Sequence, residues 1–350
     1  MTKDNGAQKR ARPRSVALLR PLLTTLLLPL KWLFRVMNRR HRQVLVRIPG
    51  GLAIYNSIAP LLVSMRSEDG TPCARVNGLK MYMDPDENAS RVASFLWGQY
   101  EPATTAVIME IVTGGDAVVD IGAHWGYYTL LVASLCGAQG QIFAFEPHPR
   151  NFSLLTKNIE ANGLTNVVAV QKAVSNRPGN VKLFQASVTT SHSLCELPPE
   201  WISGGASPKG AIDVDTIALD DFFEQGSVEP RLVKMDVEGA EPLVLAGMQR
   251  LIERHPSLVL IMEFNAAYMD GEAAADFLDQ FAARGLDLAI IDDDQLQLAV
   301  GSKAAVLKRL LDQGGTCNLL ATRDRSLMER LFRQQDGFGK HLGRLERVKL

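Results

Sequence analysis

The segment Val118-Val119-Asp120-Ile121-Gly122-Ala123-His124-Trp125-Gly126 decides how the rest of the chain is interpreted. It begins as a short apolar run, which is typical of a buried strand, and continues into a turn with two glycines that opens a helix. Glycine lets the backbone turn sharply and come close to a ligand. A strand, a glycine turn and a helix in this order predict the ligand-binding corner of a Rossmann-like α/β domain.

The chemistry of the expected ligand follows from Asp120. A dinucleotide-binding fingerprint reads G-x-G-x-x-G, whereas Asp120 stands here in place of the first glycine. A carboxylate at that point would repel a pyrophosphate and would suit a cationic or amine-bearing ligand. S-adenosylmethionine has an amino group, a sulfonium and no phosphate. The turn therefore favours this cofactor, and a nicotinamide dehydrogenase becomes the least favoured function.

A second acid lies at the end of the next apolar run, Phe145-Glu146-Pro147, 24 positions after Gly122. An acid about 20 residues beyond the glycine turn, at a strand end, is placed to accept hydrogen bonds from ribose hydroxyls. The two signals together are much more specific than a glycine turn alone. The residues predicted to bind the cofactor in these two segments are Asp120, Gly122, Ala123, Gly126 and Glu146.

Short apolar runs separated by helical segments recur beyond residue 116. They cover residues 117–121, 141–145, 167–170, 232–236, 258–262, 286–291 and 317–322. Runs this apolar suit strands that are covered on both faces, and their alternation with helices indicates a doubly wound sheet. We expect a mostly parallel seven-stranded sheet with helices on both faces.

Four regions are predicted along the chain. Residues 1–43 form a basic and apolar arm, and residues 44–112 form an N-terminal cap or substrate region with a hairpin at 76–83 and a helix at 101–112. Residues 113–322 form the cofactor-binding domain, and residues 323–350 form a helical tail. The four cysteines are widely scattered, so no zinc cluster or disulfide framework is indicated.

The arm carries most of the positive charge. Residues 1–42 contain 11 Lys/Arg and one acid, Asp4, although the whole chain has 38 basic and 38 acidic residues. The longest uncharged stretch, Pro21–Leu30, is too short to span a bilayer. Contact of residues 9–42 with an anionic membrane surface explains the composition best. A true span or uncleaved signal, and a packing or nucleic-acid arm, stay open. We expect a cytoplasmic protein that is peripheral on the inner face of a membrane.

Several motifs in order resemble the FkbM family of methyltransferases. They begin with Gly98–Pro102 and Val119–Thr129 and continue with Phe145–Pro147, Asn158–Leu164, Lys172–Ser175, Thr216–Asp220 and Lys234–Glu241. The resemblance implies the class I methyltransferase form of the Rossmann-like fold. It also implies methyl transfer from S-adenosylmethionine, usually to an oxygen of a sugar or natural product. His124 departs from the family, which more often has Asn there.

The segment Val233–Glu241 supplies the candidate catalytic residues. It holds three acids and a lysine at the end of a predicted strand, where open parallel sheets bind their ligands. An oxygen acceptor must lose its proton, so a base helps. Asp236 is the first candidate base and is also expected beside the cofactor. Glu238 is the second, and Lys234 would position a hydroxyl or lower its pKa. Helix capping is the alternative role for Glu238 and Glu241.

Other residues are candidates with weaker signals. Glu101 would accept a hydrogen bond from the amino group of the cofactor, or would act as an acid that the helix dipole favours in the first turn. Ala173 would lie near the adenine. Glu263 could line the acceptor site, and His192 lies in a loop that could act as a lid. Asp236, Glu238 and Glu263 are oxygen ligands suited to magnesium, but no spacing requires a metal, and the sequence predicts none.

Three functions therefore stay in competition. The first is an O-methyltransferase acting on a sugar, glycolipid or secondary metabolite. The second is a nucleic-acid methyltransferase, which the acids at 236–241 disfavour because they would repel a phosphate backbone, so no nucleic-acid partner is expected. The third is a membrane-tethered protein that binds the cofactor without turnover.

Overall fold

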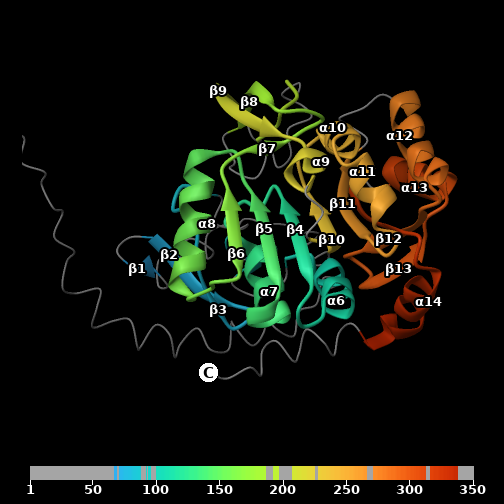
Figure 1. Ribbon diagram of the computed structural model, residues 1–350, viewed down its shortest axis with the longest axis horizontal. Coiled ribbons are helices and arrows are strands. Elements are labelled where there is room, and N and C mark those ends of the chain that lie inside the picture. The colour runs from blue at the N-terminus through green and yellow to red at the C-terminus, as the bar shows by residue number, and fades with distance from the viewer. Residues whose placement is uncertain are drawn as a thin grey trace, which may run out of the picture. The chain divides into compact units, whose positions relative to one another are not determined.

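The central feature of the computed structural model is one twisted sheet (Figure 1). Its strands run in the order β13 (Gln297–Val300), β12 (Asp287–Asp292), β14 (Thr316–Thr322), β11 (Val259–Asn265), β10 (Pro230–Met235), β4 (Ala117–Ile121), β5 (Gln141–Phe145) and β6 (Val167–Val170). The strands from β11 to β6 are parallel, and β14 is antiparallel to both β11 and β12. The order reverses between β4 and β10, and ligands of open α/β sheets bind at such a switch point.

The predicted fold class is confirmed by this sheet. The seven expected apolar runs form strands whose ends lie within three residues of the predicted ones. The described part of the sheet also contains an eighth strand, β13, which pairs antiparallel with β12. The sequence analysis did not identify β13, because this four-residue edge strand has exposed residues at both ends and an apolar run of only three residues.

The structure describes residues 67–68, 71–87, 92, 94–95, 100–186, 192–196, 207–224, 228–265, 271–312 and 316–337. The basic arm, much of the N-terminal cap and the end of the tail lie outside these residues, so the membrane contact and the four-region division stay predictions. None of the helices formed by the described residues is long and apolar enough to cross a membrane.

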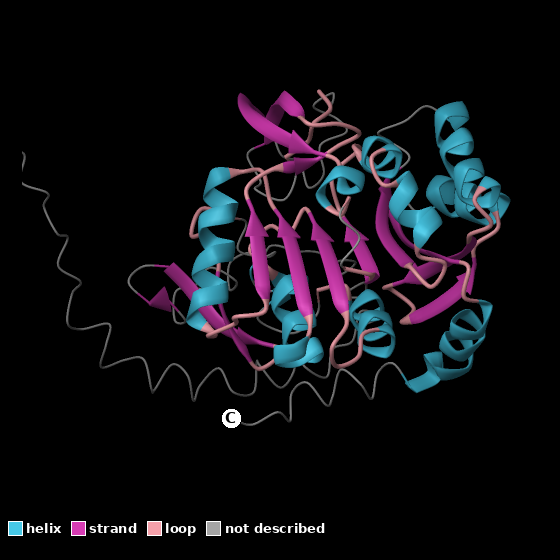
Figure 2. Cartoon of the chain, in the orientation of Figure 1, coloured by secondary structure: helices cyan, strands magenta, loops and turns pink. Residues whose placement is uncertain are grey.

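Helices cover both faces of the sheet, as Figure 2 shows. One face packs on α9 (Leu219–Phe222), α10 (Glu241–Ala246), α11 (Gln249–Arg254), α12 (Gly271–Ala283) and α13 (Lys303–Asp312). The other face carries α6 (Pro102–Ile111) and α7 (Tyr127–Cys136), and α14 (Arg325–Gln334) packs against α6. The helix α8 (Pro149–Ala161) lies beside β6.

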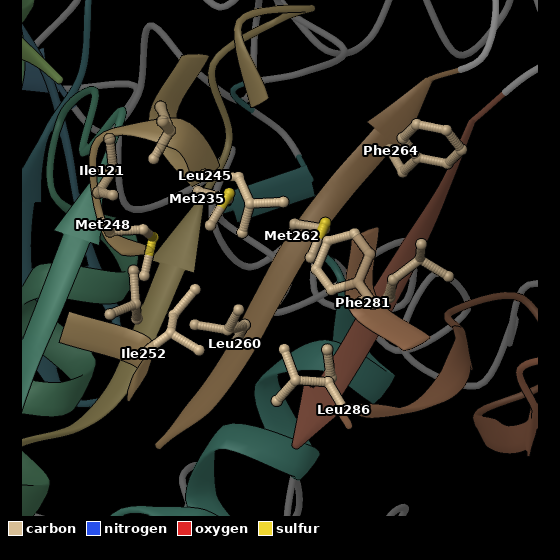
Figure 3. Packing of buried hydrophobic residues seen from close by; sticks show 14 of the residues in the cluster. Ile121, Met235, Leu245, Met248, Ile252, Leu260, Met262, Phe264, Phe281 and Leu286 are labelled. Carbon is tan, nitrogen blue, oxygen red and sulfur yellow. The ribbon is translucent and has the colours of Figure 1, made fainter. Parts of the chain in front are cut away.

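The largest apolar cluster lies on the face that packs on α9 to α13 (Figure 3). Met235 of β10 and both Leu260 and Met262 of β11 contribute to it and are fully buried, as is Phe281 of α12. Successive residues of a strand point to opposite faces. Lys234 and the other even-numbered residues of β10 therefore point to the opposite face, which α6 and α7 cover. Unlike the face with the large apolar cluster, that face carries a buried charged side chain of β10, that of Lys234.

Two smaller sheets accompany the central one. The strands β7 (Ala173–Val174), β9 (Pro208–Ile217) and β8 (Gly179–Ala186) form a sheet that lies beyond the carboxyl ends of β4, β5 and β6 in Figure 1. The strands β1 (Ser67–Glu68), β2 (Thr71–Val76) and β3 (Leu79–Tyr82) form the other sheet. The turn between β2 and β3 is at Asn77-Gly78, where the sequence predicted a hairpin.

Two asparagines one helical turn apart attach β3 to α8. The amide of Asn158 accepts from the backbone N–H of Tyr82 (2.6 Å) and donates to the carbonyl oxygens of Tyr82 (2.9 Å) and Trp125 (2.8 Å). Asn162 accepts from the N–H of Lys80 (2.8 Å) and donates to its carbonyl oxygen (2.7 Å). These two amides thus pair with backbone groups of β3 that a neighbouring strand would otherwise pair with. This docking contact is a physical reason for the Asn158–Leu164 motif.

We predict that Asn158→Asp lowers the free energy of unfolding by about 2–5 kcal/mol. The carboxylate cannot donate to the carbonyl oxygens of Tyr82 and Trp125, and each buried group left unpaired costs about 1–3 kcal/mol. Urea unfolding measures the change. Glu160→Gln, on the exposed side of the same helix, is the matched control and should stay within about 0.5 kcal/mol of the unaltered protein. Equal stability of the two variants would contradict the docking role.

Candidate active site

The glycine turn between β4 and α7 is held tightly against the end of β10. Gly122 has φ +75°, and a Cβ on it would overlap the carbonyl oxygen of Asp236. Gly126 has φ +94°, and a Cβ there would lie 2.7 Å from Leu155. His124 also adopts a positive φ of 52°. The turn therefore needs glycine at both predicted positions, and Gly122 brings the predicted cofactor turn directly against Asp236.

Asp120 and Lys234 are directly opposite each other in the parallel pair β4–β10. Both are buried, with 2% and 3% exposure. Asp120 accepts a hydrogen bond from the hydroxyl of Thr129 (2.6 Å), and burial raises the pKa of its carboxyl. The ammonium of Lys234 lies 3.1 Å from Asp236. Burial alone would lower the pKa of this lysine, but the carboxylates of Asp236, Glu101 and Asp120 raise it, so Lys234 is charged.

Glu101 comes to the same place from the start of α6. It is the N-cap residue of this helix with φ 37°, and its carboxylate accepts a hydrogen bond from the hydroxyl of Tyr128 (2.5 Å). Burial raises the pKa of Glu101 to about 7, although the charge of Lys234 opposes the shift. The nearby Asp293 fixes the first turn of α6, because it accepts from the N–H of Ala103 at 2.8 Å. The start of α6, and with it the place of Glu101, is thus fixed by Asp293, which lies 192 positions later in the chain.

Glu146 follows β5 and lies under the glycine turn. Its carboxylate oxygens accept from the backbone N–H groups of His124 (2.8 Å) and His148 (2.9 Å). The residue is 5% exposed, and burial raises the pKa of its carboxyl to about 7. A carboxylate has about four acceptor positions, so Glu146 keeps capacity for ribose hydroxyls while it holds the turn.

Three carboxylates gather where β10 and β11 end. Ligand oxygens of Asp236, Glu238 and Glu263 lie within 4.8 Å of one another, and all three residues are partly buried. Glu238 has φ 50°, and the hydroxyl of Ser193 donates to its carbonyl oxygen at 2.5 Å. Burial raises the pKa of Glu263 well above its ordinary value, and the charges of Asp236 and Glu238 raise it further. The cluster is therefore suited to a proton or a cation.

Other candidates lie further along the chain. Ala173 is buried in β7 and pairs with Thr216 of β9 in the small sheet. The ring of His192 packs on that of His148 with centroids 4.3 Å apart, and its Nδ1 accepts from the N–H of Ala186. Burial lowers the pKa of His192 to about 3, so this histidine is neutral. Glu241 begins α10 and accepts from the N–H of Gly239 (3.3 Å), which is a capping contact.

The structure brings most predicted site residues together and adds some. Glu101, Asp120, Lys234 and Asp236 interact directly, whereas Glu146 reaches them through the glycine turn. Sequence reasoning did not single out Tyr128, Asp293 and Asn318. Tyr128 was part of a quoted motif, and Asn318 is a polar residue inside an apolar strand, so both left a faint signal. Asp293, in a run of three acids, left none.

Comparison with known proteins agrees with this geometry. The pattern of the methyltransferase FkbM domain matches residues 120–287. The hexuronic acid methyltransferase AglP of Haloferax volcanii is 29% identical over 148 residues, covering 42% of this chain and 56% of that protein. Methyltransferase 1 of Beauveria bassiana is 30% identical over 152 residues, covering 37% and 57%. The chain thus spans little more than half the length of these curated relatives.

Among solved structures, a putative rRNA methylase from Clostridium thermocellum has a TM-score of 0.39 and 12% identity to this chain. The match covers 63% of this chain and 92% of that one. The sequence match over residues 120–287 includes the glycine turn, Glu146, the Asp236 segment and Glu263. The methyl donor of such a domain is S-adenosylmethionine. Residues 120–287 of this chain match the methyltransferase FkbM domain, as the sequence motifs predicted.

Proposed function

We propose that this protein transfers a methyl group from S-adenosylmethionine to a hydroxyl oxygen of a sugar, glycolipid or secondary metabolite. One observation carries the proposal. Gly122 of the cofactor turn is in contact with the backbone of Asp236, and Asp236 begins the cluster of three carboxylates. A cofactor bound at the turn would therefore lie next to carboxylates that can accept a proton.

The residues present fit the cofactor. Glu146 is buried at the strand end, where its carboxylate can accept from the ribose hydroxyls. Glu101 and Asp120 place two further carboxylates near the turn, with only Lys234 to balance them among the described residues. An amino group and a sulfonium are the charges that such surroundings favour. The absence of a side chain at Gly122 lets the turn lie directly against the carbonyl oxygen of Asp236.

The bound cofactor would supply an electrophilic methyl group, whose bond to sulfur breaks as the acceptor oxygen attacks, the electron pair remaining on sulfur. The chain must orient the acceptor in line and receive its proton. Asp236 is our first candidate to receive this proton, and Glu238 is the second. Lys234 is buried and paired with Asp236. We therefore propose that Lys234 is a positioning residue that fixes the direction of the Asp236 carboxylate.

The acceptor class rests on weaker support. The relative AglP is named a hexuronic acid methyltransferase, and the resemblance to the FkbM family points to oxygen acceptors. The carboxylates at positions 236, 238 and 263 would repel the phosphates of a nucleic acid. A hydroxyl acceptor needs a proton acceptor nearby, and this cluster provides one.

We predict that the full-length protein binds S-adenosylmethionine with micromolar affinity in calorimetry. The double variant Asp120→Asn, Glu146→Gln should bind at least about 100-fold more weakly, because two charge-assisted hydrogen bonds are each worth about 1.5–3 kcal/mol. The double variant Glu253→Gln, Asp276→Asn changes two exposed acids of the same types and should bind normally. Absence of binding by the folded, unaltered protein would refute the proposed function.

The affinity for S-adenosylmethionine should increase as the pH rises through about 7. Ribose hydroxyls donate to the ionised form of Glu146, whose pKa is raised to about 7 in the free protein, so binding must first remove a proton at lower pH. One such group changes the affinity about tenfold between pH 8 and pH 6. Two other titratable groups lie near Glu146. The like charge of Asp120 raises the pKa of Glu146 further, and burial lowers the pKa of His148.

Glu101, whose pKa is also raised to about 7, should add to this dependence. In Glu146→Gln the contribution of Glu146 disappears, so the affinity should be lower at pH 8. The ratio of the affinity at pH 8 to the affinity at pH 6 should be about tenfold smaller than in the unaltered protein. Calorimetry at several pH values provides the comparison. A variant that keeps the full pH dependence would exclude Glu146 as the titrating group.

Asp236→Asn should reduce methyl transfer at least about 100-fold, since a positioned base contributes about 10²–10⁴-fold. The affinity for the cofactor should change less than tenfold. The assay follows the labelled methyl group into a mixture of hexoses, hexuronic acids and their methyl glycosides. Glu253→Gln serves as the control. Unchanged transfer in Asp236→Asn would contradict the proposed role, and transfer to no member of the mixture by the unaltered protein would contradict the acceptor class.

A further inference from the structure

Three polar side chains form a row across neighbouring strands at the carboxyl end of β10. The β10–β11 register pairs Met235 with Met262, so the next residues, Asp236 and Glu263, lie side by side. The β11–β14 register places Asn318 directly opposite Glu263. Side chains of directly opposite residues point to the same face of a sheet. The row is therefore Asp236, Glu263, Asn318, with Glu238 close to the first two.

The amide of Asn318 has a defined orientation. Its Nδ2 donates to a carboxylate oxygen of Asp293 (3.0 Å), and only the nitrogen end of an amide can do so. Asp293 belongs to the turn after β12, which pairs with β14 on the side away from β11. The Oδ1 atom of Asn318 is therefore directed toward Glu263. The residue is 8% exposed, and this buried oxygen has no hydrogen-bond donor among the residues that the structure describes.

An unpaired acceptor oxygen beside acidic groups indicates a missing donor or cation. Buried polar atoms normally have a partner, and each exception needs a physical reason. Six carboxyl groups lie in this region together with the ammonium of Lys234; they belong to Glu101, Asp120, Asp236, Glu238, Glu263 and Asp293. A bound S-adenosylmethionine would add a single net positive charge. The carboxyl groups of this region outnumber these two positive charges, so a further cation would favour their ionised forms.

We propose that Asp236, Glu238, Glu263 and the Oδ1 atom of Asn318 bind a divalent cation that prefers oxygen ligands, Mg²⁺ or Ca²⁺. Three ionised carboxylates and an amide oxygen are typical ligands of these ions. The carboxylate oxygens lie within 4.8 Å of one another. Two ligands on opposite sides of one Ca²⁺, at about 2.4 Å each, are about 4.8 Å apart, whereas Mg²⁺ at about 2.1 Å needs separations of at most about 4.2 Å.

This site reverses the expectation of no metal that the sequence alone supports. Four protein ligands leave two or more coordination positions of a six- to eight-coordinate ion open. If the proposed methyl transfer holds, an acceptor hydroxyl can occupy one of them, and the ion then lowers the pKa of that hydroxyl and holds its oxygen beside the cofactor turn. Asp236 then binds the ion through one carboxylate oxygen, and its other oxygen receives the proton of the hydroxyl, as in the proposed function. Binding of the ion itself does not depend on the reaction.

The first test is calorimetric titration of the chelator-treated, full-length protein with MgCl₂ and with CaCl₂, without S-adenosylmethionine. We expect one site per chain with a dissociation constant of about 10⁻⁵–10⁻³ M. Mn²⁺ provides a spectroscopic probe, because the free ion is quantified by electron paramagnetic resonance. Failure to bind any of the three ions at about 10 mM by folded protein would overturn the proposal.

The variants Glu263→Gln and Asn318→Ala test the ligands. Glu263→Gln should weaken binding at least about tenfold, and Asn318→Ala should weaken it less because the amide is neutral. Glu253→Gln, an exposed glutamate, should bind as the unaltered protein does. Thermal unfolding without metal checks that each variant is folded. Equal affinity of Glu263→Gln and the control would overturn the assignment.

Parallel titration with S-adenosylmethionine separates this inference from the proposed function. Cofactor binding without ion binding would remove the metal site and leave the methyltransferase proposal intact. Ion binding without cofactor binding would support the metal site and refute the methyltransferase proposal. The ion should also raise the thermal unfolding temperature of the unaltered protein, since a ligand of the folded state stabilises that state. The rise should be smaller in Glu263→Gln.

Discussion

The ammonium group of Lys234 is the interaction on which the charged end of the sheet depends. It is 3% exposed and lies among the carboxylates of Asp236, Glu101 and Asp120. Carboxylates that lose water in a protein interior are costly unless an opposite charge is close. Lys234 provides that charge from inside the strand, where its backbone is fixed by pairing on both sides. Because Asp120 and Glu101 come from other segments, this one side chain joins three parts of the chain.

The alternation of side chains along the strands separates stability from chemistry. Val233 and Met235 of β10 point to the large apolar cluster, whereas Leu232 and Lys234 point to the face of α6 and α7. On that second face, the residues change from apolar to charged as β10 approaches its carboxyl end. A register shift of one residue would exchange the two faces. The packing of the apolar cluster on one face therefore fixes the register that places Lys234 on the other face.

Contacts between distant segments set the electrostatics of the site. Asp293 caps α6 and orients Asn318, so one carboxylate determines both where Glu101 lies and where the Asn318 oxygen points. Burial raises the pKa of Glu101 and of Glu146 to about 7 in the free protein. Groups with such shifted pKa values are common in functional sites. A bound cationic ligand can stabilise the ionised form of a buried carboxyl group.

The sequence by itself determined the local features of this protein. The glycine turn, the apolar strands and the acids at 120, 146 and 236 could be predicted because each depends on neighbouring residues and a fixed spacing. The Asn158–Leu164 motif was visible, but its role in docking β3 was not. Only the tertiary structure decided that Lys234 is buried among carboxylates, that β13 extends the sheet, and that Glu263 faces Asn318. These depend on the register of strands far apart in the chain, including the antiparallel β14, and short-range sequence patterns do not specify that register.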